Sequence, residues 1–173
     1  MNYRKTQIII ALSEVFEGNP WYGDSVMRKL ENIPFITGDM NCQPQSHSVA
    51  QIVGHLIAWK TFALEKLKLN SDFDIDIDSN KDWPEIEINS AKEWEGLKQE
   101  LVSVQSELYK FLDDKEDKFL DEMVDGRTYS FEYLLNGIVQ HDVYHIGQIG
   151  LIQSQLKRNE LNTEIYRVQN SKD

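Results

Sequence analysis

Two histidines spaced four residues apart, His141 and His145, are the side chains of this sequence best suited to carry chemistry. Because an α-helix completes a turn about every 3.6 residues, this spacing places both imidazoles on one face, one turn apart. Gln148 follows three residues later, on nearly the same face. The rest of that face is apolar and keeps a similar step: Leu134, Ile138 and Ile152. A buried imidazole requires a polar partner, so the two rings are expected either to hydrogen-bond to neighbours or to bind a metal ion.

A third histidine, His55, has a similar position on another predicted helix. It lies beside an apolar face that comprises Ile52, Leu56, Trp59, Ala63 and Leu67. Three inward imidazoles would supply three nitrogen ligands at about 2.0–2.1 Å from a zinc-like ion and leave a coordination position open for water or substrate. An open position is typical of catalytic sites, whereas structural zinc sites are usually closed by four protein ligands rich in cysteine. The pattern therefore favours a catalytic metal site, with hydrogen-bonded structural histidines as the alternative.

Helix-period patterns of apolar residues predict the elements that carry these histidines. We expect four long helices, at residues 3–16, 48–69, 90–112 and 130–158. The second and third begin with capping-box sequences, Ser48 to Gln51 and Ser90 to Glu93. A short helix through Val26, Met27 and Leu30 is expected after the first. The polar tail from Asn159 is expected to fray, so that the last helix ends near Arg158.

The connections between these helices are long and varied: residues 31–46, 70–89 and 119–129. Four long helices joined in this way predict an all-α fold, an antiparallel four-helix bundle that forms a single domain over residues 1–173. Such bundles commonly build metal sites from inward-facing side chains on different helices. That is the placement predicted for the three histidines.

The composition argues against several classes of partner. The net charge is -11 and lysine and arginine form no cluster, which argues against nucleic-acid partners and against binding to an anionic membrane surface. No apolar segment is long enough to cross a bilayer, and the charged N-terminus does not resemble a signal peptide. Cys42 is the only cysteine, so no internal disulfide can form and we expect a reducing compartment, the cytoplasm.

An alternation of aspartates in the second connection resembles a calcium site. Asp74, Asp76 and Asp78 are spaced as in an EF-hand, but Ser79 replaces the glycine that the sharp turn of that motif requires. We therefore expect a solvated acidic loop, whose apolar residues pack on the bundle: Phe73, Ile75 and Ile77.

Three other potentially reactive side chains are expected to have ordinary structural roles. His47 stands in a polar run before its helix and is expected to be an exposed loop residue. Nothing near Cys42 in the sequence would lower its pKa, so an inert or buried thiol is expected. Asp142 points away from the face of the two adjacent histidines, which favours a surface or interhelical position over a contact with the metal ligands.

The order and spacing of these motifs resemble a known family. His141, His145 and Gln148 form an H-x-x-x-H-x-x-Q run that resembles the signature of the DinB/YfiT-like superfamily. Residues 124–130 resemble that family's lead-in to its last helix. Residues 19–23, and the segment from His47 to Trp59, are similar to one branch of the family, so the resemblance covers about residues 2–157.

The resemblance implies a four-helix bundle with a three-histidine metal site, whose ligands are His55, His141 and His145. Members with assigned activity are often thiol transferases that join a low-molecular-weight thiol, such as bacillithiol or mycothiol, to an electrophile. Others are described as metal-dependent hydrolases, and homodimers are common. The family name refers to induction by DNA damage and does not imply DNA binding, which agrees with the acidic charge. All three expected ligands are present.

Together, the residues and the resemblance predict a metal-dependent enzyme that acts on a small molecule. Zinc and nickel are the leading metals, because imidazole suits both. The ion would lower the pKa of a bound thiol or water, which would make a thiol S-transferase or a hydrolase respectively. Gln148 would hydrogen-bond to a ligand imidazole or to a metal-bound water, or simply pack on its helix face. The alternative is a non-catalytic dimeric module in stress response, with a structural or vestigial metal site closed by a fourth ligand or by packed side chains.

Overall fold

The computed structural model describes residues 2–38 and 46–170 of the chain, with side chains described up to residue 159. The elements in order are α1 (Tyr3–Phe16), α2 (Val26–Glu31), α3 (Phe35–Gly38), α4 (Val49–Leu67), α5 (Ala91–Asp113), the 3-10 helix η1 (Asp117–Asp121) and α6 (Phe131–Asn170). The described residues form no strand, only an isolated bridge between Met123 and Ser130. The predicted all-α class is therefore confirmed. Cys42 lies outside the described residues.

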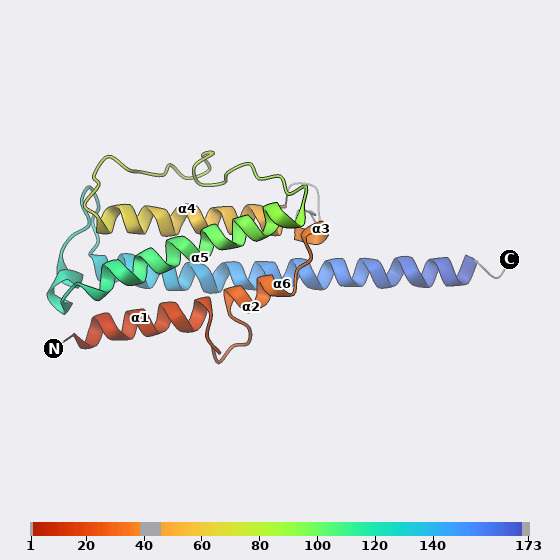
Figure 1. The fold of residues 1–173 in the computed structure, drawn as a ribbon, viewed down its shortest axis with the longest axis horizontal. Helices are drawn as coiled ribbons and strands as arrows, with labels where there is room; N and C mark the ends of the chain where they lie inside the picture. Colours follow the sequence, from red (N-terminus) through yellow and green to blue (C-terminus); the bar gives the residue numbers. More distant parts are fainter. Residues whose placement is uncertain (1, 39–45, 171–173) are drawn as a thin grey trace.

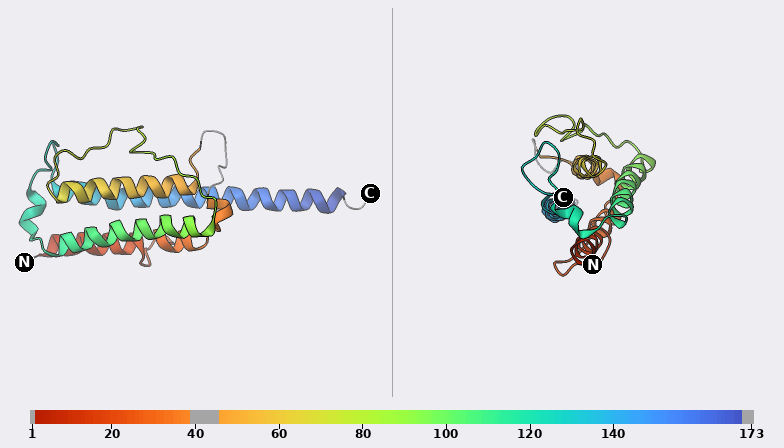
Figure 2. Two further views of the ribbon diagram at one scale, coloured as in Figure 1. Left: turned by 45° about the horizontal axis from the view of Figure 1, so that its top comes forward. Right: turned by 90° about the vertical axis from the view of Figure 1, so that its left-hand side faces the viewer.

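The four long helices α1, α4, α5 and α6 lie side by side and contact one another (Figures 1 and 2). Helices α1 and α6 run in one direction, and α4 and α5 run in the other (Figure 1). The consecutive helices α4 and α5 are therefore parallel, which departs from a simple alternating order. Residues 68–90 make this possible, because they return along the outside of α4 as a long connection (Figure 1).

The predicted helix starts are set by local hydrogen bonds. Ser48 caps α4 with both bonds of a capping box, since its hydroxyl accepts from the Gln51 N–H and the Gln51 side chain accepts from the Ser48 N–H. At α5 the Ser90 hydroxyl accepts from the Glu93 N–H, but the Glu93 carboxylate accepts from the N–H of Asn89. The second predicted box is thus only half formed.

Helix α6 is longer than the sequence pattern predicted. It continues to Asn170 and extends beyond the other helices, whereas its end was expected near Arg158 (Figure 1). Residues 159–170 are polar but contain neither proline nor glycine, so no residue there breaks the helix. A polar segment lacks an apolar face that could pack on other helices, but its backbone can still form helical hydrogen bonds.

The long connection 68–90 packs on α4 through a glycine. A Cβ added at Gly54 would lie 2.2 Å from Cδ1 of Ile86 and 3.0 Å from Cγ of Pro84, so the absence of a side chain at Gly54 lets these two residues approach α4 closely. Ile75 is buried and Phe73 is half-buried against the core, as predicted. Ile77 is 77% exposed, so the prediction that it packs on the helices is wrong. The chain turns just after it, where Asp78 has a φ of 62° and donates its N–H to the Asp82 carboxylate.

The helical body has two buried apolar clusters, one around α1, α5 and the start of α6, and one around α2 and the first half of α4. Within the described residues, no helix has both the length and the apolar character that crossing a bilayer requires.

Candidate metal centre

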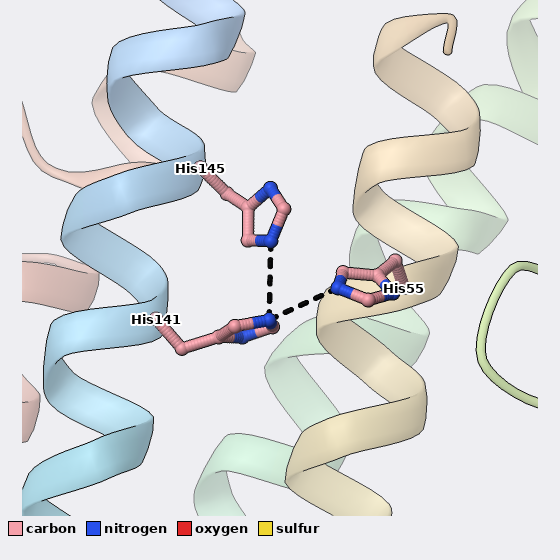
Figure 3. A group of neighbouring side chains, drawn as sticks. All are labelled: His55, His141 and His145. Atoms are coloured by element: carbon pink, nitrogen blue, oxygen red, sulfur yellow. Dashed lines mark hydrogen bonds between the residues drawn. The ribbon is translucent and has the colours of Figure 1, made fainter. Parts of the chain in front are cut away.

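The three histidines that the sequence singled out lie together between α4 and α6 (Figure 3). The Nε2 atom of His141 is 3.0 Å from Nε2 of His55 and 3.1 Å from Nε2 of His145. His55 and His145 are buried, at 6% and 2% exposure, and His141 is half-buried. Nitrogen ligands at about 2.0–2.1 Å from a shared ion lie roughly 3 Å from one another, so these two distances suit a single metal ion. All three ligand atoms lie within 4.8 Å of one another.

An ion pair joins α4 and α6, the two helices that carry the three histidines, beside this cluster. Lys60 Nζ on α4 is 2.6 Å from Oδ2 of Asp142 on α6, and the two residues are 1% and 0% exposed. Gln105 on α5 accepts a second hydrogen bond from Lys60, at 2.8 Å. Burial raises the pKa of Asp142, and the lysine opposes that rise. Of the positions expected for Asp142, the interhelical one is confirmed and the surface one is wrong.

The outward nitrogens of two of these rings face only hydrogen-bond acceptors. His55 Nδ1 lies 2.8 Å from the carbonyl oxygen of Asp82 and 3.0 Å from its Oδ1. His145 Nδ1 lies 2.7 Å from Oε1 of Gln148. Both Nδ1 atoms therefore carry the proton, and both Nε2 atoms present a lone pair to the centre of the cluster. The predicted contact of Gln148 with an imidazole is therefore present, and that imidazole is His145.

In the absence of a cation, this protonation pattern leaves one Nε2 lone pair without a hydrogen-bond donor. Nε2 of His141 can donate one hydrogen, which satisfies either His55 or His145 and leaves the other lone pair facing nitrogen. A divalent cation accepts all three lone pairs at once. The donor set therefore fits a metal ion better than it fits a set of mutual hydrogen bonds.

The rings are neutral near pH 7, as metal ligands must be. Burial, together with the neighbouring His145 and His55, lowers the pKa of His141 to about 3. Burial likewise lowers the pKa of His145 to about 4, against a smaller raising effect of Gln148. The pKa of His55 is also lowered by burial, although Asp82 opposes this. Protons therefore compete weakly with a metal at neutral pH.

Asp82 is a residue of this site that the sequence did not reveal. It was assigned to the solvated acidic loop, yet it is 3% exposed and accepts from Nε1 of Trp59 at 2.7 Å as well as from His55. No helical spacing connects it to His55, because it reaches the ring from the long connection. The glycine that precedes His55 is the one local signal, since it marks where another segment approaches α4 closely.

We expect Asp82→Asn to weaken metal binding by about 10- to 100-fold, because the neutral amide no longer fixes the His55 tautomer or raises the basicity of its ring. Competition with a chromophoric chelator measures this affinity. Asp76→Asn removes the same charge from an exposed position in the same loop and should leave the affinity unchanged. Equal affinities for wild type and Asp82→Asn would show that Asp82 does not orient a ligand.

An open cleft of about 490 Å³ adjoins the three histidines. Trp83 forms part of its wall and stacks on the His55 ring, with ring centroids 3.8 Å apart. His47 stacks on the opposite face of Trp83, at 3.6 Å. His47 is exposed, as predicted, but its position on the rim of this cleft was not. Among the residues that the structure describes, no fourth histidine, cysteine or carboxylate joins the cluster.

Comparison with known proteins agrees with this geometry. A family model described as DinB superfamily matches residues 27–149, a range that includes all three histidines and Gln148. Neither the curated proteins nor the solved structures yield a match to this chain. Because the family model covers well over half of the sequence, the chain belongs to the DinB superfamily.

Proposed function

We propose that this member of the DinB superfamily is a metal-dependent enzyme acting on a small molecule, either a thiol S-transferase or a hydrolase. His55, His141 and His145 would hold the divalent ion, zinc or nickel, on a four-helix bundle in which α4 runs antiparallel to α6 but parallel to α5 (Figure 1). The observation that carries the proposal is the convergence of three neutral imidazole nitrogens beside an open cleft. A site for a purely structural ion would instead be expected to have a fourth protein ligand and no room for a substrate.

When bound, the ion would supply Lewis acidity that lowers the pKa of an adjoining thiol or water toward neutrality. In the transferase reaction, the sulfur of RSH bonds to an electrophilic carbon, the leaving group X departs with its electron pair, and the thiol proton leaves with it as HX. In the hydrolase reaction, water takes the place of the thiol. Both reactions need no redox partner.

The residues of the chain have separate tasks in this proposal. Asp82 and Gln148 keep the Nδ1 protons of His55 and His145 in place, so that both Nε2 lone pairs stay directed inward. Trp83 covers one face of the His55 ring and keeps water from it. The Lys60–Asp142 pair keeps α4 and α6 in register, so that the ligands from the two helices meet.

Activity of metal-loaded protein toward thiol–electrophile pairs and activated esters tests the proposal. Wild type loaded with zinc or nickel should turn over at least one class. His145→Ala should fall to the background rate while its circular dichroism remains helical, because the variant loses a ligand and alanine favours helix. His47→Ala makes the same change on the cleft rim and should retain metal-dependent turnover. Activity that survives both chelation and His145→Ala would overturn the proposal.

A further inference from the structure

The walls of the cleft beside the histidines are strongly aromatic. Five of its lining residues are tyrosine or tryptophan: Trp59, Trp83, Tyr129, Tyr133 and Tyr144. The faces of Trp83 are occupied by His47 and His55, so Trp59 and the three tyrosines are the rings left to contact a ligand. Tyr133 and Tyr144 are 68% and 64% exposed although each is next to this apolar cleft. Exposed aromatic surface gathered in one place marks a binding site for an apolar partner.

A glycine opens the floor of the cleft between these rings and the histidines. Gly137 lines the cleft one helical turn before His141, and a Cβ added there would meet nothing within 4 Å. The open space beside the α6 backbone therefore continues from the tyrosine wall to the His141 ring. Leu134 and Ile138 line the same stretch with apolar side chains. A flat ring that enters between the tyrosines can reach the histidine nitrogens along this path.

The cleft offers no cation to a negatively charged ligand. None of its lining residues in the described structure is lysine or arginine, and Asp82 contributes a carboxylate. The undescribed segment 39–45 contains neither residue in its sequence. The side chain of Arg127 interacts with the lining residue Tyr129, but its charge is paired with the carboxylate of Asp74. An anion that entered the metal-free cleft would lose hydration without gaining a counter-ion from the protein.

We propose that the cleft binds an aromatic small molecule that carries no negative charge, as the electrophile or ester of the reaction proposed above. The role of this molecule as a substrate rests on the proposed function, whereas its binding to the cleft does not. The acidic loop beside the cleft adds to this selection against anions. Ile77 of that loop lines the cleft, and its neighbours Asp76 and Asp78 are exposed. Thiols that carry several carboxylates have no lysine or arginine partner among the cleft residues described.

Isothermal titration calorimetry with three naphthalene probes of similar size tests this selectivity. The probes are 2-naphthylmethanol, 2-naphthylmethylamine as its cation, and 2-naphthoate. In metal-free full-length protein at low salt, the first two should bind and 2-naphthoate should bind at least about tenfold more weakly. Metal-free protein is used because a carboxylate would also bind a metal ion directly. Comparable or tighter binding of 2-naphthoate, or binding of none of the three, would overturn the inference.

Two pairs of variants locate the binding in the cleft. Tyr133→Ala should weaken 2-naphthylmethanol about tenfold, whereas Tyr3→Ala, which removes an equally exposed tyrosine from α1, should not change it. Ile77→Lys supplies the missing cation and should strengthen 2-naphthoate, while Ile36→Lys on α3 should not. Failure of both cleft variants to differ from their controls would contradict the location. Probe selectivity without metal binding would overturn only the proposed enzyme function.

Discussion

Protein purified without a histidine tag and reconstituted with zinc or nickel will hold about one equivalent of metal, and His141→Ala will hold none after desalting. His141 is the central member of the cluster, because its Nε2 lies 3.0 Å from that of His55 and 3.1 Å from that of His145. Removing it leaves two ligands on different helices, which cannot enclose an ion as three do. Elemental mass spectrometry of both proteins measures the metal content.

The control for this experiment is another histidine of the same region. His47→Ala removes an exposed imidazole that stacks on Trp83, and it should keep the full equivalent of metal. Because His141 is half-buried and alanine is a good helix former, His141→Ala is expected to remain folded, which circular dichroism verifies. Absence of metal from wild type after reconstitution would leave the three histidines as hydrogen-bonded structural residues.

The sequence predicted the parts of the site that depend on helical periodicity. The spacing of His141, His145 and Gln148 places them on one face whatever the rest of the chain does, and the apolar face beside His55 determines its direction as well. The start of α4 was equally local, since Ser48 and Gln51 form their capping box within four residues. Local patterns of this kind are retained in the fold because the tertiary contacts favour the same helices.

The parts that the sequence did not predict depend on contacts between distant segments. Asp82 reaches His55 only because the connection 68–90 returns along α4, which also makes α4 and α5 parallel. Lys60 occupies a buried position that its residue type disfavours, and only the meeting of α4, α5 and α6 supplies its partners. The aromatic cleft is likewise assembled from α4, the long connection, the segment before α6 and α6 itself.

Asp142→Ala is expected to lower the free energy of unfolding by about 3–5 kcal/mol, because it leaves the Lys60 ammonium buried without a counter-ion. Lys60 is 1% exposed, and after the change Gln105 is its one remaining partner among the described residues with a hydrogen bond to Nζ. Urea unfolding of chelated protein, followed by circular dichroism, measures the change without a contribution from bound metal. Asp76→Ala, an exposed aspartate in a loop, should change the same quantity by less than about 0.5 kcal/mol.

Replacing both members of the pair separates the cost of an orphaned charge from the worth of the ion pair itself. In Lys60→Met with Asp142→Leu, no charge remains buried, so most of the stability lost in Asp142→Ala should return. A residual deficit of about 1–3 kcal/mol is expected, because Oε1 of Gln105 loses the donor that it has at 2.8 Å. If Asp142→Ala instead costs less than about 1 kcal/mol, water must reach Lys60 when its partner is absent. The pair would then be a dispensable link between α4 and α6, and the register that brings His55 to His141 and His145 would rest on apolar packing alone.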